Sequence, residues 1–203
     1  MARIQLKILY YMKTEQLTGK KVAILATDGF EQDELLSPLE ALRDAGADVQ
    51  VVSPSTESKI KGWKGTDWGK KVTVDLSLND AISEEFDALV LPGGVMNPDH
   101  LRRDPLVLEF VKSFFTAGKP VGAICHGPWT LIDAGVVRGR TMTSYASIQT
   151  DLKNAGANWV DEEVVVDNGL VTSRKPDDLP AFNAKLIEEI AEGVHQRQAA
   201  LTA

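Results

Sequence analysis

The hydrophobic positions along the chain form two kinds of pattern that alternate with each other: short continuous runs and positions spaced three or four residues apart. Short apolar runs at residues 20–26 and 119–125 are typical of strands that are buried in a sheet. Between residues 27 and 47, leucines recur three and four positions apart, which is the spacing of a helix with one apolar face. A further apolar run at 48–54 completes a strand–helix–strand unit, and such units build parallel sheets.

The same alternation predicts most of the remaining regular elements. A strand is followed by a helix, or a helix by a strand, along almost the whole chain. We expect further strands at 83–94 and 141–145, and helices at 104–118, 127–139, 147–157 and 177–198.

Two segments depart from the alternation. Residues 55–80 contain several glycines and alternating apolar residues, which predict a hairpin or an excursion at the edge of the sheet. Residues 158–174 predict a hairpin around an Asn-Gly turn. The whole pattern predicts one α/β domain at residues 20–192, with a mostly parallel central sheet and helices on both faces. We expect an N-terminal extension at 1–19 and a C-terminal tail at 193–203.

Composition and charge limit the partners and the compartment. The chain has 203 residues and a net charge of −7, and an acidic surface disfavours nucleic acid or an anionic membrane as the main partner. A single cysteine cannot form an internal disulfide, which indicates a reducing compartment, and we expect the cytoplasm. No apolar run reaches the length of a membrane span.

Three loops carry the polar residues at predicted strand ends, which is where open α/β sheets place their sites. They are residues 27–34, 92–100 and 125–128, and we expect them to converge. No pair of His or Cys has the spacing of metal ligands, and the chain has neither a P-loop nor the GxGxxG fingerprint. We therefore expect neither a metal nor a cofactor.

Cys125 lies where a buried strand meets a helix, which is the position of a nucleophile elbow. The amides and the dipole of the following helix favour a thiolate, so we expect a lowered pKa for this thiol. An inert buried cysteine is the alternative, and the strand-end position favours the nucleophile. His126 follows directly and can serve as base and acid beside the sulfur, or lie in solvent as a cap.

The other two loops offer an acid and a pair of glycines. Glu31 can present a buried carboxyl group to the thiol, although its loop also reads as an ordinary acidic first helical turn. Gly93 and Gly94 allow a backbone amide to come close to a ligand, and the amides of Gly94 and His126 are the candidate oxyanion hole. Asp99 is either an acid that orients the imidazole or a helix cap.

Several segments together resemble the PfpI family, within the superfamily of the class I glutamine amidotransferases. They are DGFEQDEL, FDALVLPGG, GKPVGAICHGPWTLIDAGVVRGRTMTSY and NAGANWVDEEVVVDNGLVTSRKPDDLPAF, in this order, and the resemblance covers about residues 20–190. It implies a flavodoxin-like three-layer sandwich with Cys125 as nucleophile and Glu31 as the acid that hydrogen-bonds the thiol. It also implies a homo-oligomer, dimer or hexamer, in which Asp99 reaches His126 from a neighbouring subunit. The loop VMNPDHLR departs slightly, because it has Asp where some members have Glu.

The resemblance implies a stress-related, cysteine-dependent hydrolase, either a deglycase or glyoxalase-like enzyme or a peptidase. Its substrate is then a small carbonyl compound or a glycated protein or peptide, with no cofactor. Two alternatives remain open. The cysteine can be a redox sensor that is oxidised without turnover, or the protein can act as a holdase-type chaperone.

Overall fold

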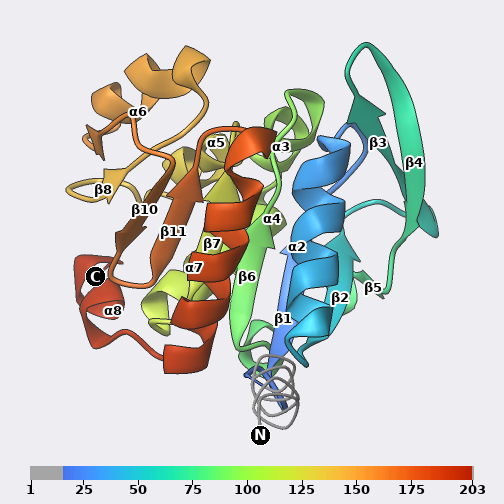
Figure 1. Ribbon diagram of the computed structural model, residues 1–203, viewed down its shortest axis with the longest axis horizontal. Coiled ribbons are helices and arrows are strands. Elements are labelled where there is room, and N and C mark those ends of the chain that lie inside the picture. Colours follow the sequence, from blue (N-terminus) through green and yellow to red (C-terminus); the bar gives the residue numbers. More distant parts are fainter. Residues whose placement is uncertain (1–15, 203) are drawn as a thin grey trace, which may run out of the picture.

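A seven-stranded sheet forms the middle layer of the computed structural model, which describes residues 16–202 (Figure 1). The strand order is β10-β11-β7-β6-β1-β2-β5, and every neighbouring pair is parallel except the hairpin of β10 and β11. The strands are β1 (Lys21–Leu25), β2 (Asp48–Ser53), β5 (Leu76–Ser77), β6 (Ala88–Leu91), β7 (Val121–Ile124), β10 (Val164–Asp167) and β11 (Leu170–Ser173).

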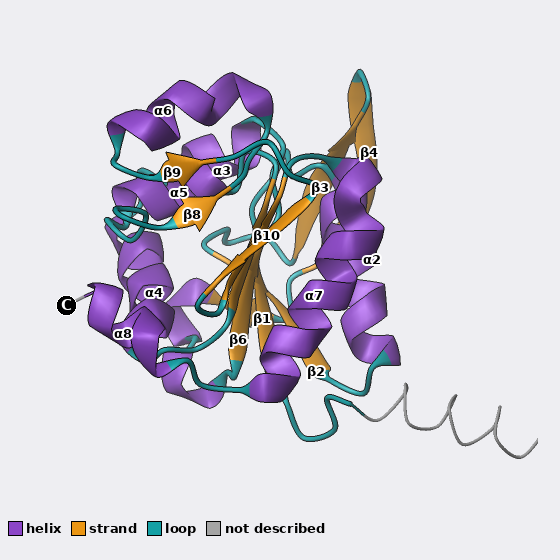
Figure 2. Ribbon diagram, turned by 60° about the vertical axis from the view of Figure 1, so that its left-hand side comes forward, coloured by secondary structure: helices purple, strands orange, loops and turns teal. Residues whose placement is uncertain are grey.

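The central strands are covered on both faces, which is why they read as unbroken apolar runs. Every residue of β6, β7 and β11 is buried. Figure 2 shows the sheet edge-on, with helices on either side of it. This confirms the predicted α/β fold with a mostly parallel central sheet.

Among the described residues, two helices cover one face of the sheet and five helices lie on the other side. The first layer contains α2 (Gln32–Asp44) and α7 (Leu179–Glu192). The second layer contains α3 (Met96–Leu101), α4 (Pro105–Thr116), α5 (Pro128–Asp133), α6 (Gln149–Asn154) and α8 (Gln196–Thr202).

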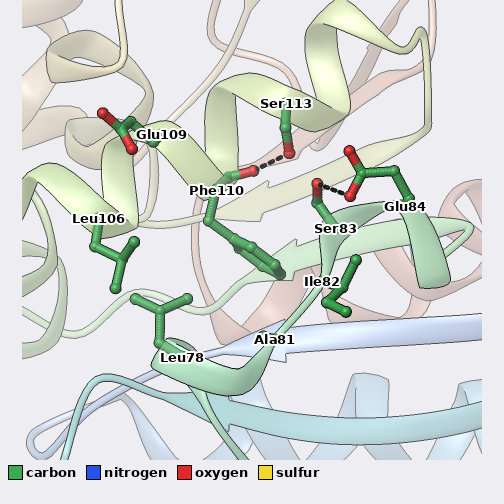
Figure 3. Close-up of a pocket in the computed structure, with 9 residues that line it drawn as sticks. All are labelled: Leu78, Ala81, Ile82, Ser83, Glu84, Leu106, Glu109, Phe110 and Ser113. Carbon is green, nitrogen blue, oxygen red and sulfur yellow. Dashed lines mark hydrogen bonds between the residues drawn. The ribbon is translucent and has the colours of Figure 1, made fainter.

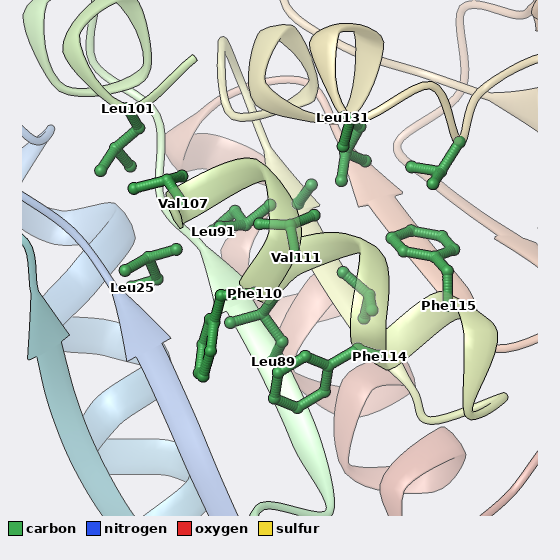
Figure 4. Close-up of a cluster of buried hydrophobic side chains, with 14 of the residues drawn as sticks. Leu25, Leu89, Leu91, Leu101, Val107, Phe110, Val111, Phe114, Phe115 and Leu131 are labelled. Atoms are coloured by element: carbon green, nitrogen blue, oxygen red, sulfur yellow. The ribbon is translucent and has the colours of Figure 1, made fainter. Parts of the chain in front are cut away.

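Each layer has its own hydrophobic core. On the α4 side, Phe110, Val111, Phe114 and Phe115 pack against the sheet together with Leu89 (Figure 4). A fully buried Phe or Leu contributes about 1.5–3 kcal/mol relative to an exposed one, so this helix is a main anchor of the fold. The start of α4 matches the sequence signals, because Asp104 caps it and Pro105 occupies its first turn.

The segments that depart from the alternation lie outside the centre of the sheet. Strands β3 (Lys59–Lys64) and β4 (Asp67–Thr73) form a separate hairpin, and β5 returns to the sheet edge. The short strand β8 (Thr141–Met142) pairs with β9 (Asn158–Trp159) away from the main sheet. The helix predicted at 127–139 is shorter than expected, because α5 ends at Asp133.

The structure shows more order at the two ends of the domain than the predicted N-terminal extension and C-terminal tail. Residues 1–15 of the predicted extension lie outside the described residues, and Leu17 is buried in the α2-side core. The closing helix stops at Gly193, where φ is 90°, and the chain continues as α8. The buried Arg140 donates from Nη2 to the Gln198 carbonyl at 3.3 Å, which fastens α8 to the domain. No helix within the described residues is long and apolar enough to cross a membrane.

Candidate active site

Cys125 lies on a sharp turn between β7 and α5. Its φ of 61° is in the left-handed region, which costs a residue with a side chain about 1–3 kcal/mol. Two backbone hydrogen bonds hold the turn. The Cys125 N–H donates to the Ser173 carbonyl at 3.0 Å, and the Cys125 carbonyl accepts from the Tyr145 N–H at 2.9 Å. This is the strand-to-helix elbow that the sequence predicts, and Cys125 is 6% exposed.

The imidazole of His126 lies beside the sulfur rather than in solvent. Its Nδ1 is 3.1 Å from Cys125 Sγ, and its Nε2 is 3.0 Å from Ser147 Oγ. The ring stacks on Tyr145 with a centroid distance of 4.9 Å and meets the edge of Trp129 at 5.2 Å. The imidazole is therefore confined on several sides, and its two nitrogens have different partners.

A carboxyl group approaches the sulfur from the opposite layer, and it belongs to Glu34. Glu34 is fully buried, and its Oε2 accepts a hydrogen bond from the Gly93 N–H at 2.9 Å. The carboxyl group also interacts with the Cys125 thiol. The residue lies on the same buried face of α2 as Pro38 and Leu42, four and eight positions later. This spacing is the signal by which the sequence could have located it.

The expectation that Glu31 hydrogen-bonds the thiol is wrong. Glu31 is the N-cap of α2, and its carboxylate accepts a hydrogen bond from the Glu34 N–H at 2.8 Å. A capping side chain must fold back toward the first turn of its own helix, so it cannot also extend to the elbow. The acid in contact with the thiol lies three residues later.

The burial of Glu34 determines its protonation. Burial and the nearby charge of Glu31 raise the pKa of Glu34 to about 8. At neutral pH this group is therefore mostly protonated, and it can donate a hydrogen bond to sulfur.

The thiol does not have the lowered pKa that the sequence suggested. Burial raises the pKa of the Cys125 thiol, and an ionised Glu34 raises it further, whereas the backbone amides of Gly94 and His126 lower it. Desolvation outweighs the amides. A thiolate in this site therefore needs a protonated Glu34 and a base that accepts the thiol proton.

The backbone amides of Gly94 and His126 lie near the Cys125 sulfur and lower the pKa of the thiol. These are the two groups expected for the oxyanion hole. Gly94 has a φ of 77°, and a Cβ there would lie 2.5 Å from the Gly29 carbonyl oxygen, so a side chain does not fit. The glycine pair thus brings a donor to the sulfur from a loop that is distant in sequence.

The three predicted loops converge at this end of the sheet. The Glu31 N–H donates to the Gly93 carbonyl at 3.3 Å, which joins the first loop to the second. The buried Asn97 accepts from the Thr27 N–H at 2.8 Å and donates to the Pro92 carbonyl at 2.9 Å. Asn97 was not among the predicted residues, although its side chain ties these two loops together.

Asp99 lies away from these groups within one chain. It is an exposed residue inside α3, so it neither caps a helix nor contacts the imidazole in the described chain. The second nitrogen of His126 faces Ser147 instead. Ser147 and Tyr145 come from the segment after β8, and neither was singled out as a site residue from the sequence.

Two other features are separate from this site. Glu189, Glu192 and His195 place ligand-type atoms within 4.8 Å of one another, and His195 Nε2 is 3.3 Å from Glu189 Oε2. We assign no ion to this cluster, because the contact between His195 and Glu189 already accounts for two of its members.

A groove of ≈ 340 Å³ lies between α4 and the segment before β6, and its lining is mostly apolar (Figure 3).

The fold and the site define a class of protein: an α/β sandwich with a cysteine on an elbow, flanked by a histidine and a buried carboxylic acid. The model of the DJ-1/PfpI family matches residues 20–189, and the chain belongs to this family.

Two of the relatives similar to this chain are named as a deglycase and as a stress protein. "Protein/nucleic acid deglycase 2" of Escherichia coli is 49% identical over 83% of this chain and 96% of that protein. "General stress protein 18" of Bacillus subtilis is 49% identical over 81% of this chain and 94% of that protein. A crystal structure from Anabaena variabilis, with DJ-1/ThiJ/PfpI-like and ferritin-like domains, is 40% identical with a TM-score of 0.80. It aligns over 84% of this chain and 48% of its own.

Proposed function

We propose that this protein is a cysteine-dependent hydrolase that acts on carbonyl adducts of proteins or on small carbonyl compounds. The observation that carries the proposal is the pair of Cys125 Sγ and His126 Nδ1, 3.1 Å apart on the elbow. A nucleophile and a base within hydrogen-bonding distance are the arrangement of covalent catalysis. The name of the E. coli relative supports the choice of a deglycase over a peptidase.

The proposed reaction begins with the transfer of the thiol proton to Nδ1 of His126. For a methylglyoxal adduct of an amine, the thiolate displaces the amine at the former aldehyde carbon, and the imidazolium gives its proton to the leaving amine. The product is a hemithioacetal. His126 then moves a proton from this carbon to the neighbouring ketone carbon, which converts the hemithioacetal into the thioester of lactate without an external oxidant. Water adds to the thioester carbonyl, and the amides of Gly94 and His126, which lie near the sulfur, are placed to hold the oxyanion. Its collapse releases lactate and the thiol, so the net reaction consumes one water and releases the amine and lactate.

Glu34 contributes its proton rather than a charge. A protonated carboxyl group donates a hydrogen bond to the thiolate, whereas a carboxylate would repel it. The pKa of about 8 keeps this group mostly protonated at neutral pH. The activity is therefore expected to fall as the pH rises well above 8.

The test is the release of lactate from methylglyoxal-treated protein by the wild type and by Cys125→Ala. We expect the variant to fall to the uncatalysed background, because the chain has no other cysteine. Treated DNA serves as a second substrate, and the net charge of −7 favours protein adducts over it. Equal lactate release by the two proteins would exclude the proposed activity.

We infer a second candidate, in which the same sulfur is a redox sensor. The observation that favours it is the set of donors around the sulfur: two backbone amides and the Glu34 carboxyl group. Attack of the thiolate on hydrogen peroxide breaks the O–O bond and gives a sulfenic acid and hydroxide, which takes the imidazolium proton to become water. A second peroxide gives the sulfinic acid, to which the same donors can hydrogen-bond.

Mass spectrometry after mild peroxide treatment checks this role. We expect Cys125 to gain one or two oxygens before the four methionines of the chain are oxidised. Glu34→Ala, which removes one donor, is expected to slow the second addition. A cysteine that stays a thiol while the methionines oxidise would rule the sensor out.

We also propose that the protein is a homo-oligomer in the cytoplasm. Val95, next to Gly94, is 58% exposed, and Tyr145, which stacks on His126, is 43% exposed. A neighbouring copy that covers these side chains would shield the sulfur from water. Asp99 is exposed on α3, where a second copy could approach it.

A further inference from the structure

The outer nitrogen of His126 has a defined partner within its own chain. Ser147 Oγ is 3.0 Å from Nε2, on the side of the ring away from the sulfur. His126 is buried, with 7% of its surface exposed, whereas Ser147 is exposed. The serine hydroxyl is therefore the group through which this buried ring meets the surface.

Backbone contacts hold Ser147 in place. It lies in a 3-10 turn at Ala146–Ile148, directly after Tyr145. The Tyr145 N–H donates to the Cys125 carbonyl at 2.9 Å, and the side chain of Ile148 is buried in the α4-side core. The serine is thus anchored between the elbow and the core, although its own side chain is at the surface.

Aromatic contacts confine the plane of the imidazole but do not choose its orientation. Tyr145 stacks on the ring at an interplanar angle of 25°, and Trp129 meets it at 64°. A half-turn about the Cβ–Cγ bond would keep that plane and place a ring carbon where Nδ1 now faces Cys125. A hydrogen bond at Nε2 is lost in that half-turn, so it selects the orientation in which Nδ1 points to the sulfur.

We propose that Ser147 is a positioning residue for the Cys125–His126 pair, and that its hydroxyl takes within one chain the place of an orienting acid. This inference rests on the proposed function only in treating the pair as reactive. The Ser147 oxygen accepts the Nε2 proton, which leaves Nδ1 free to receive the thiol proton. When Nδ1 has received it, the same oxygen hydrogen-bonds the imidazolium and stabilises the thiolate–imidazolium pair.

A hydroxyl differs from a carboxylate in what it does to the base. A carboxylate at Nε2 would favour the charged imidazolium, whereas a neutral hydroxyl stabilises it less. Burial lowers the pKa of His126.

The neighbours of the ring offer little to offset that burial. The titratable groups in contact with it are the Cys125 thiol and the Tyr145 phenol, and Glu34 reaches it only through the sulfur. Asp151 and Arg102 contact the Trp129 ring rather than the imidazole. With Ser147 as its partner, His126 stays a neutral base at neutral pH.

The experiment measures the alkylation rate of the full-length protein with iodoacetamide between pH 6 and 10. All thiol alkylation reports on Cys125, because the chain has a single cysteine. We expect Ser147→Ala to slow alkylation about 3- to 10-fold between pH 6 and 8, which is the range for loss of one hydrogen bond. Ser147→Thr keeps the hydroxyl and should restore most of the rate.

Ser147→Asp separates positioning from a merely structural role. A carboxylate stabilises the imidazolium and so increases the thiolate fraction, which makes this variant faster than the wild type at pH 6–8. The differences between the variants are read at pH 6–8, where Glu34 is mostly protonated, because its ionisation at higher pH disfavours the thiolate in every variant. Thr150→Ala, which removes an exposed hydroxyl from α6, is the matched control and should leave the rate unchanged.

Three results would overturn the inference. They are an unchanged rate in Ser147→Ala, an equal loss in Ser147→Thr, or a loss in Asp99→Asn without one in Ser147→Ala. The last would assign the orienting role to an acid from a neighbouring copy. Because alkylation needs no turnover, failure of this inference can be told apart from failure of lactate release.

Discussion

Replacing Glu34 by glutamine is expected to remove a large part of the pH dependence of folding between pH 4.5 and 8. The pKa of Glu34 is raised from 4.5 to about 8 in the folded protein, so the folded state binds this proton more tightly than the unfolded chain. The stabilisation is fully present below pH 4.5 and is lost as the pH rises toward 8. The loss has a slope of at most about 1.4 kcal/mol per pH unit, or on the order of 5 kcal/mol in total.

Glutamine keeps the size and the acceptor of the side chain but cannot ionise. The free energy of unfolding of Glu34→Gln should therefore exceed that of the wild type by a margin that grows from pH 4.5 to 8. Urea denaturation at a series of pH values measures the margin. Glu40→Gln removes the same charge from the exposed face of α2, and it should follow the wild type. Parallel curves for the wild type and Glu34→Gln would show that Glu34 is not protonated in the folded state.

Replacing Gly93 by alanine is expected to damage both the fold and the site. A Cβ at this position would lie 2.6 Å from Glu34 Oε2, 2.7 Å from Cys125 Cβ and 2.8 Å from the Ile124 carbonyl oxygen. Two of these atoms belong to the elbow and its strand, so neither can move away cheaply. We expect a loss of about 1–3 kcal/mol in unfolding free energy from the overpacking. We also expect turnover to fall by about 100-fold, because the sulfur and the carboxyl group are displaced.

Gly135→Ala is the control for this variant. A Cβ there meets no atom within 4 Å, although φ is 74°. It should cost about 1–2 kcal/mol of backbone strain without changing the alkylation rate of Cys125. If Gly93→Ala were alkylated as fast as the wild type, the close contact of Gly93 with the elbow would not matter for the site.

The order of helices and strands could be predicted from the sequence, because it depends on the local spacing of apolar residues. The apolar runs at β1, β6 and β7 are continuous, since both faces of these strands are covered, and α2 and α4 carry clear signals at their ends. The predictions were weaker where an element is very short. Strands β8 and β9 have two residues each, and too few positions exist there to show a period.

Part of the candidate site could also be predicted from the sequence. Cys125 and Gly94 stand next to strand ends, and parallel strands bring their carboxyl ends to one edge of a sheet. Glu34 was missed because a glutamate in the first turn of a helix normally interacts with the helix dipole in solvent. Only the packing of α2 against the sheet shows that this glutamate faces inward.

By itself, the sequence determined that this is an α/β domain with a mostly parallel sheet and with its single cysteine at a strand-to-helix junction. Hydrophobic periodicity is local, so it survives without knowledge of contacts. The tertiary structure decided which acid reaches the sulfur, that burial raises the pKa of both groups, and that Ser147 faces the outer nitrogen of His126. These depend on side chains that are distant in sequence, and on the loss of water around them when the layers pack together.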